Sequence, residues 1–365
     1  MVVGRPGKYA IFIVSMNLNE KFLLTIGIPT FNREHSLSRT LEDLIKQVRS
    51  SKNQSNIEIL VSDNCSIDNT RLIVKNYMGA NEDISLSYFK NQSNLGYDGN
   101  CNQVFKYAQG CFVWLMSDDD AINNLAVKKI FNICKKYRNV DVIFVNYRLY
   151  DSTFTDVISD SDCSLEGENI ELTDANSFYD ITNFSNSFVS SNVIKASCWR
   201  KAFREEYLGT LWIHFYIVRD ILTQGESLVI KTPVLKMGSL NVIDSRKEKY
   251  VQGQYDFYLE AHKKFVKFVY ELPEKGYAIN LYNKAKEKLL GETLRQIIRN
   301  KYTSNSYDIE HLVYTYKWSK IYFGDKVFYW TLIVPILFSP VFFWKLSYNF
   351  IASSYKRLKR YALID

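Results

Sequence analysis

The sequence predicts an α/β fold in which a mainly parallel, doubly wound sheet is covered by helices on both faces. Short apolar runs of strand length alternate with amphipathic helical patterns over residues 22–147, as in repeated β-α units. The chain has 365 residues, 47% hydrophobic and 23% charged, a composition typical of a folded globular protein. It contains only 6 prolines and 15 glycines, so most of it should be regular structure.

Five strands are expected in the first half of the chain. The first is an apolar run that starts at Phe22 and stops before Pro29. The fourth is almost wholly apolar, so it should lie in the centre of the sheet. The expected strands are 22–28, 57–61, 84–89, 111–116 and 141–147.

Four helices are expected between these strands. The first carries an apolar stripe at helical spacing, formed by Leu37, Leu41, Leu44, Ile45 and Val48. Asp68 can cap the second helix, whose apolar face would hold Leu72, Ile73 and Tyr77. The third spans 99–109 and stops at Gly110, and the fourth spans about 124–137.

The second half of the chain is expected to complete the α/β domain and then become helical. Residues 151–180 are polar and acidic, which predicts loops and short strands over the mouth of a site. Residues 184–203 begin polar and alternating and then turn helical, and residues 244–320 contain amphipathic helices. We therefore expect an N-terminal extension (1–21), an α/β domain (22–240), a helical region (241–320) and a C-terminal segment (321–365).

Charge and cysteine content exclude several classes of protein. A net charge of +7 over 365 residues does not indicate nucleic-acid binding. The six cysteines include no C-x-x-C pair, so a zinc ribbon is not expected, and their scattered spacing predicts free thiols in a reducing compartment. The apolar run 9–14 is too short for the core of a signal peptide.

Polar residues follow each of the first four expected strands. Because the carboxyl ends of parallel strands meet at one edge, these residues should form one ligand site. They are Pro29, Thr30, Asn32 and Arg33; Asp63, Asn64, Ser66 and Asp68; Asn94, Gly96, Tyr97, Asp98 and Gly99; and Asp118, Asp119 and Asp120. Three consecutive carboxylates predict a divalent cation, Mg²⁺ or Mn²⁺. The alternative is a solvated turn that caps the next helix.

The order of these motifs resembles that of family 2 glycosyltransferases. "LTIGIPTFNREHSLSRTLEDLI" is similar to their opening S-I-P-T-Y-N-R segment, and "EILVSDNCSIDNT" to E-I-I-V-V-D-D-G-S-T-D-G-T. The segment from "NQSNLGYDGN" to "SDDDAI" is similar to the one that ends in their metal-binding aspartates. Asn64 and Cys65 replace an Asp and a Gly, and Ser117 replaces the first Asp of the metal motif.

The resemblance implies the A-type glycosyltransferase fold for residues 22–240 and a nucleoside-diphosphate sugar as donor. Metal on Asp118, Asp119 and Asp120 would neutralise the leaving diphosphate, which gives Asp120 a catalytic role. The residues implied in nucleotide binding are Pro29, Thr30, Asn32, Asp63, Ser66, Asn94, Gly96 and Asp118. Asp63 is expected at the edge of the base. Arg33 is interpreted as a solvated residue at the start of a helix.

A narrower resemblance is to bacterial O-antigen abequosyltransferases. It is carried by "FLLTIGIPTFNR", "SDNCS", "SDDD" and, most characteristically, Gly-Tyr-Asp-Gly-Asn at 96–100. It implies transfer of a 3,6-dideoxyhexose such as abequose to an O-antigen saccharide on a polyprenyl diphosphate. Two alternatives stay open: another donor, for capsule or other surface polysaccharide, and a non-catalytic nucleotide-sugar-binding membrane protein.

His214 occupies the position of the catalytic base in the family resemblance. "LWIHFYIVRDILTQGESL" is similar to the segment that carries an Asp base in inverting members, and counting back from Gly225 puts that position on His214. An imidazole can accept a hydroxyl proton at neutral pH. The alternatives are a hydrogen-bonded core histidine, a weaker base candidate in Asp220, and a retaining enzyme without this base.

The C-terminal segment is expected to associate with a membrane surface. Residues 327–344 carry no charge, but Pro335 and Pro340 interrupt them, which favours an interfacial or re-entrant helix pair over a full span. The basic residues that would face an anionic leaflet are Lys345, Lys356, Arg357, Lys359 and Arg360. This predicts a location at the cytoplasmic face of a bacterial inner membrane. The alternative is that the segment docks on the α/β domain.

Overall fold

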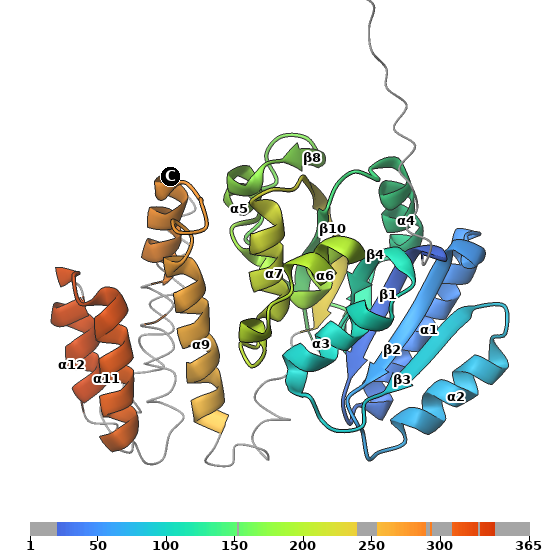
Figure 1. Cartoon of the computed structure of the whole chain (residues 1–365), viewed down its shortest axis with the longest axis horizontal. Helices are drawn as coiled ribbons and strands as arrows, with labels where there is room; N and C mark the ends of the chain where they lie inside the picture. Colours follow the sequence, from blue (N-terminus) through green and yellow to red (C-terminus); the bar gives the residue numbers. More distant parts are fainter. Residues whose placement is uncertain are drawn as a thin grey trace, which may run out of the picture.

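The computed structural model describes residues 20–151, 153–238, 254–289, 293, 309–327 and 329–339. Its centre is one sheet of ten strands with helices on both sides (Figure 1). The strands are β1 (Phe22–Thr30), β2 (Ile57–Asp63), β3 (Ser85–Lys90), β4 (Gly110–Leu115), β5 (Ala121–Ile122), β6 (Val142–Tyr150), β7 (Val157–Asp160), β8 (Ile170–Thr173), β9 (Asn192–Lys195) and β10 (Ser227–Gly238). All five predicted strands are present, with ends shifted by no more than three residues.

The sheet is mixed rather than mainly parallel, so this part of the prediction is wrong. Its order is β3-β2-β1-β4-β9-β6-β10-β5, with β7 beside β6 and β8 beside β10. The half from β3 to β4 is parallel, but β9 runs antiparallel to both β4 and β6. β9 is four residues long, and Val193 and Ile194 within it are fully buried. Four residues are too few to show a clear strand periodicity, so the sequence did not distinguish β9 from the polar residues before it.

Helices cover both faces of the sheet, as predicted. One apolar core lies under α1 (Glu34–Ser51), α2 (Thr70–Ala80) and α4 (Ala126–Lys136). The other lies under α3 (Gly96–Tyr107), α5 (Ala175–Thr182), α6 (Ala196–Ala202) and α7 (Ile213–Leu222). The predicted stripe of α1 is entirely buried. The predicted face of α2 is wrong in part, because Leu72 is 57% exposed and Val74 is the buried apolar residue.

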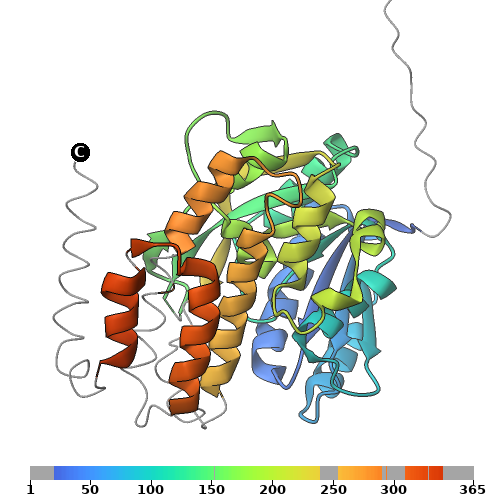
Figure 2. The same cartoon turned by 60° about the vertical axis from the view of Figure 1, so that its left-hand side comes forward.

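Helices of the second half continue the core on the α7 side. α9 (Gln254–Tyr270), residues 279–289, α11 (Ile309–Phe323), the π-helix η5 (Tyr329–Ile333) and α12 (Val334–Phe338) contribute to it. α11 contacts both α9 and α12, and Figure 2 shows these three helices along one side of the molecule. Phe268 of α9 stacks on Phe215 of α7 with ring centroids 4.0 Å apart. The helical region is therefore packed onto the α/β domain through aromatic side chains.

The described part of the C-terminal segment is partly buried. Tyr329, Ile333 and Leu337 are fully buried in the core, whereas Trp330 and Phe338 are exposed. Within the described ranges, no helix combines the length and apolar character needed to cross a bilayer. The predicted basic cluster at Lys345 and 356–360, and the predicted N-terminal extension up to residue 19, lie outside the described residues.

Candidate active site

The carboxyl ends of three neighbouring strands meet at one edge of the sheet. β1 lies between β2 and β4, is parallel to both, and pairs Thr30 with Asp63 in the ladder to β2. The turn after β4 brings Asp118 to this edge, where Thr30 Oγ1 donates a hydrogen bond of 2.6 Å to Asp118 Oδ2. Pro29 lies half-buried just before Thr30. The structure thus brings together residues predicted from separate motifs.

Two carboxylates of the aspartate cluster, defined here as Asp118, Asp119 and Asp120, are buried. Asp118 is 4% and Asp120 is 7% exposed. Burial raises the pKa of Asp118 to about 6 and that of Asp120 to about 8. Ser190 Oγ donates to Asp120 Oδ2 at 2.5 Å, which only partly offsets the cost of burying its charge. The cluster therefore favours additional positive charge.

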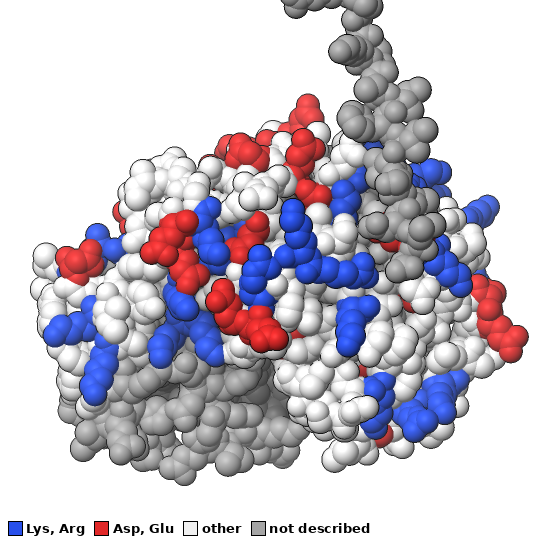
Figure 3. All heavy atoms as spheres, viewed as in Figure 1, with Lys and Arg blue, Asp and Glu red and all other residues white. Residues whose placement is uncertain are grey.

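Arg33 supplies part of that charge, a role that the sequence analysis missed. Its Nη1 lies 3.2 Å from Asp118 Oδ1 and also contacts Asp119 Oδ2. Arg39, six residues further on in α1, donates from Nη2 to the backbone oxygen of Asp119 at 3.1 Å. The space-filling view shows side chains of both signs mixed over the face that it presents (Figure 3). Asp118 and Asp119 lie 85 and 86 positions after Arg33, so only the tertiary structure reveals this pairing.

The loop after β2 is held together by Asp63. This residue is fully buried, and its two oxygens accept hydrogen bonds from the Ser66 backbone N–H at 2.8 Å and the Tyr88 hydroxyl at 2.5 Å. Ser66 Oγ in turn accepts from the Asn32 backbone N–H at 2.9 Å. Asn32 is exposed and left-handed, with φ 52°. Direct contact between Asp63 and a base would require this loop to open.

Asn64 has a structural role in place of the acidic residue common at that position. Its Nδ2 donates to Asn94 Oδ1 at 2.7 Å and to the backbone oxygen of Gly96 at 3.1 Å. Its Oδ1 accepts from the Leu95 backbone N–H at 2.8 Å. An amide can donate and accept at the same time, which a carboxylate cannot. Asn94 and Gly96, both predicted to bind nucleotide, are thereby fixed at the exposed start of α3.

Two buried polar residues of α3 position the site; Asp98 was expected among the polar residues after the third strand, whereas Asn100 was not in that set. Asn100 Oδ1 accepts from Ser62 Oγ at 2.7 Å, and its Nδ2 donates to the backbone oxygen of Ser62 at 2.9 Å. Asp98 accepts from the backbone N–H groups of Leu211 at 2.7 Å and Ile213 at 3.1 Å, at the start of α7. Burial raises the pKa of Asp98, and these two donors oppose the shift. α3 therefore connects the strand ends to α7.

His214 lies inside α7 and is 2% exposed. Its Nε2 is 2.9 Å from the backbone oxygen of Ser187, which requires the proton on Nε2, while Nδ1 is buried without a hydrogen-bond partner among the described residues. Burial lowers the pKa of His214 to about 4, so the ring is neutral at physiological pH. Asp220, the weaker base candidate, is engaged by Tyr207 and Arg219.

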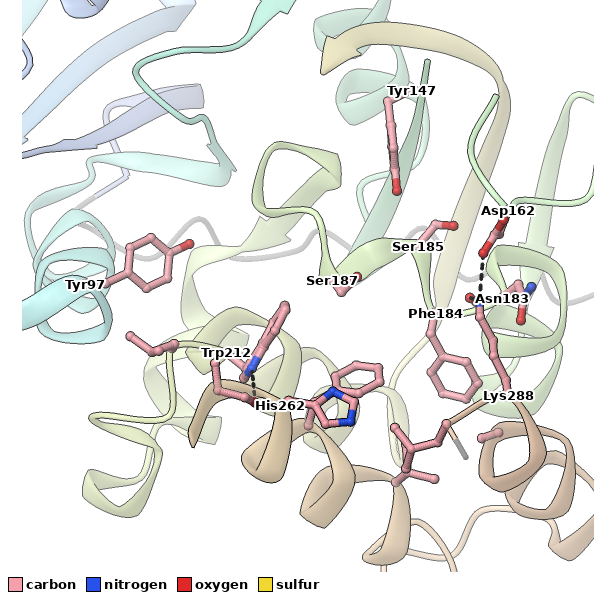
Figure 4. A pocket seen from close by; sticks show the side chains of 16 residues that line it. Tyr97, Tyr147, Asp162, Asn183, Phe184, Ser185, Ser187, Trp212, His262 and Lys288 are labelled. Carbon is pink, nitrogen blue, oxygen red and sulfur yellow. Dashed lines mark hydrogen bonds and ion pairs between the residues drawn. The ribbon is translucent and has the colours of Figure 1, made fainter. Parts of the chain in front are cut away.

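A cavity of about 630 Å³ lies between the α/β domain and helices α9 and 279–289 (Figure 4). Its aromatic lining consists of Tyr97, Tyr147, Phe184, Trp212 and Phe265. Lys288 stands at the end opposite Tyr97 and donates to Asp162 Oδ2 at 2.8 Å. Burial raises the pKa of Tyr147 to about 12, and the charge of Asp120 adds to this effect.

The chemistry of the aspartate cluster fits a divalent cation. Carboxylate oxygens are the donors that Mg²⁺ and Mn²⁺ prefer, and the raised pKa values of Asp118 and Asp120 show that their charge is incompletely compensated. Among the residues that the structure describes, no three His, Cys, Asp or Glu side chains converge tightly enough to hold an ion. In this arrangement the Arg33 guanidinium forms an ion pair with one carboxylate oxygen of Asp118 and one of Asp119.

Sequence comparisons find known proteins that are similar to the first half of the chain. Residues 25–196 match the family model described as glycosyl transferase family 2. A GalNAc(5)-diNAcBac-PP-undecaprenol β-1,3-glucosyltransferase of Campylobacter jejuni is 30% identical over 53% of this chain and 59% of its own. Abequosyltransferase RfbV of Salmonella typhimurium is 27% identical over 54% of this chain and 61% of its own. The match to these curated relatives spans about three fifths of their length.

Solved structures share the fold at low sequence identity. Residues 1–349 of Staphylococcus aureus TarS in complex with UDP align with a TM-score of 0.57 at 16% identity, covering 80% of this chain and 78% of that one. The mannosyltransferase PcManGT from Pyrobaculum calidifontis, in complex with GDP-Man and Mn²⁺, aligns with a TM-score of 0.50 at 15% identity, covering 86% and 84%. The A-type α/β fold expected from the motifs is confirmed.

Proposed function

Because residues 25–196 match the model of glycosyl transferase family 2, we propose that this chain transfers a sugar from a nucleoside-diphosphate donor to a saccharide carried on a polyprenyl diphosphate. The observation that carries the proposal is the joining of Thr30, Asp63 and Asp118 at the carboxyl edge of the parallel strands. The relatives from Campylobacter jejuni and Salmonella typhimurium support a lipid-linked acceptor.

The donor would lie along the loops that follow β1, β2 and β3. Asn32, Asn94 and Gly96 are exposed there and can contact a nucleotide directly. Thr30, Asp63 and Ser66 are buried and would hold those loops in place. Asp118, Asp119 and Asp120 would hold Mg²⁺ or Mn²⁺, which supplies charge stabilisation for the leaving diphosphate. Asp118 is kept in position for this role by Thr30 and Thr40.

The acceptor saccharide would occupy the cavity between Tyr97 and Lys288. Its volume lies within the range of ordinary small-molecule sites, and it combines apolar rings with a few fixed polar groups. Tyr97 lies at one end of the cavity and Lys288 at the other. Transfer would occur at the Tyr97 end, because Tyr97 directly follows Gly96 at the proposed donor site. His214 is the proposed base, since its neutral ring offers the unpartnered Nδ1 as a proton acceptor. Its burial requires a rearrangement before that atom meets the acceptor hydroxyl.

Abequose is one candidate donor sugar, and glucose is the other. The motif at 96–100 and the match to RfbV favour abequose, whereas WfgD of Escherichia coli, a UDP-Glc:α-D-GlcNAc-diphosphoundecaprenol β-1,3-glucosyltransferase, is 31% identical over 36% of this chain and 47% of its own. Nucleoside-diphosphate release should be measured with a panel of donors and a lipid-linked acceptor. Asp118→Asn should abolish release, while Asp83→Asn should not, because Asp83 precedes the amino end of β3, at the opposite edge of the sheet from the site.

No release with any donor, together with no binding of nucleotide or Mn²⁺ by calorimetry, would favour a non-catalytic protein on the same scaffold. Binding without release would point to an absent donor or acceptor in the panel and would keep the transferase proposal. The panel must therefore vary both substrates.

The C-terminal segment is proposed to bring the site to the membrane surface that holds such an acceptor. The exposed Trp330 and Phe338 support this, because aromatic rings favour the membrane interface. A carbonate wash of membranes should release a variant that lacks residues 340–365 more easily than the full chain. If the membrane retains both proteins equally, residues 340–365 do not anchor the chain, and residues 329–339 serve only to pack against the rest of the protein.

A further inference from the structure

Arg33 places one nitrogen atom between two carboxylates of the aspartate cluster. Its Nη1 contacts Asp118 Oδ1 at 3.2 Å and also contacts Asp119 Oδ2. The other oxygen of each carboxylate is held by a hydroxyl group, from Thr30 at 2.6 Å and from Ser117 at 2.5 Å. The two remaining oxygens thus point to a common position, and a cationic nitrogen occupies it.

A metal ion shared by Asp118 and Asp119 would need the same two oxygens. Mg²⁺ binds carboxylate oxygen at about 2.0–2.1 Å, so the ion and the guanidinium nitrogen cannot occupy this position together. Like charges at such a distance also repel strongly. One of the two cations must therefore leave when the other binds.

Arg33 is the group that is free to move. Its side chain is 46% exposed, compared with 5% for the side chain of Asp118. Asp118 is fixed by Thr30 through its carboxylate and by Thr40 through its backbone oxygen. Arg33 directly precedes α1, so its backbone can stay in place while the long side chain turns into solvent.

We propose that Arg33 is an exchangeable counter-ion, which neutralises Asp118 and Asp119 in the metal-free protein and releases both when Mg²⁺ or Mn²⁺ binds. This inference rests on one part of the proposed function, the binding of a divalent metal at the aspartate cluster, and does not depend on the identity of the sugar or the acceptor. It makes Arg33 a positioning residue that keeps two adjacent carboxylates together between catalytic cycles. Metal affinity is then lower than the carboxylates by themselves would give, because each binding event displaces an ion pair.

Titration of the full-length protein with Mn²⁺ alone tests the exchange. Calorimetry should be performed at the same pH on the wild type and on Arg33→Gln. The variant should bind Mn²⁺ about threefold to tenfold more tightly, the range expected from losing two half-exposed ion pairs. Equal or weaker binding by a folded Arg33→Gln protein would overturn the proposal.

Arg39→Gln is the matched control. It removes the same charge from the same edge of the site, but Arg39 contacts only the backbone oxygen of Asp119 in this cluster and blocks no carboxylate. Its Mn²⁺ affinity should stay within twofold of the wild type. Equal tightening in both variants would show a general field effect and overturn the exchange.

The two levels of the proposal fail differently. If neither the wild type nor Arg33→Gln binds Mn²⁺, the metal in the proposed function fails together with the exchange. If both bind equally, only the exchange fails. Should Arg33→Gln not fold, a crystal structure of the wild type with Mn²⁺ decides: Arg33 Nη1 still bridging Asp118 and Asp119 beside the ion would refute the proposal.

Discussion

Replacing His214 with glutamine separates a catalytic role from a structural one. Glutamine keeps a donor for the backbone oxygen of Ser187, which His214 Nε2 now reaches at 2.9 Å, and it removes the imidazole. If His214 is the base, turnover should fall by about 10²–10⁴-fold while the protein stays folded. If the ring only fills the core, turnover should stay within a few-fold of the wild type, and the base would have to be sought elsewhere.

The stability of the same variant gives an independent readout. Burial lowers the pKa of His214 from about 6.5 to about 4, so the unfolded chain takes up a proton below pH 6.5 that the folded protein refuses until about pH 4. The folded state therefore loses stability as the pH falls through this window. One such histidine contributes at most about 1.4 kcal/mol per pH unit. His214→Gln should reduce the slope of unfolding free energy against pH by up to that amount.

The assay combines the two measurements. Urea unfolding from pH 4 to 7 gives the slope, and the pH profile of kcat/KM with saturating donor gives the titrating groups. A base with a pKa near 4 predicts no loss of wild-type activity between pH 7 and 5.5 from this residue. The base assignment fails if His214→Gln retains near-normal turnover, whatever happens to the slope. His262→Gln is a useful control, since burial also lowers the pKa of His262, a residue of α9 that lines the cavity, to about 4.

Three further predictions follow from the site. Asp98→Ala should lower the free energy of urea unfolding by about 2–4 kcal/mol, because two buried backbone donors at the start of α7 lose a charged acceptor, whereas Asp98→Asn should lose less. In metal-free buffer the folded protein keeps a proton on Asp120 up to about pH 8, so its melting temperature should fall as pH rises from 5 to 9, and Asp120→Asn should flatten this dependence. Tyr97→Ala should raise the acceptor KM by up to about tenfold without changing the donor KM, and Tyr97→Phe should not, provided that the ring stacks on the saccharide.

The parallel half of the sheet was predictable because each of its strands carries its own signal. The apolar runs at 22–28 and 111–116 are long enough to be recognised, and the polar residues after them must share an edge once the strands are parallel. The antiparallel β9 was not predictable in this way. Its four residues gain their place by pairing with β4 and β6, which lie far away in the sequence.

The roles that the sequence analysis missed at the site share a different cause. Asp98, Asn100 and Arg33 were visible in the sequence as polar residues near strand ends, but their roles depend on partners chosen by the fold. Asp98 binds a backbone group 113 positions later, and Arg33 binds carboxylates 85 and 86 positions later. No local pattern specifies such pairs. The presence of Asn at position 64 is explained only by the structure, in which Asn64 hydrogen-bonds to the loop after β3.

The way each buried acid is compensated separates structural carboxylates from those that can take part in chemistry. Asp63 and Asp98 accept hydrogen bonds from backbone or hydroxyl groups that cannot leave without local unfolding. Asp118 and Asp119 are compensated by a half-exposed arginine side chain, which can leave. Asp120 has the least compensation, since its neighbouring carboxylates add to the effect of burial. A ligand cation gains most where the existing compensation is removable or incomplete, so we expect such a cation at the aspartate cluster rather than at Asp63 or Asp98.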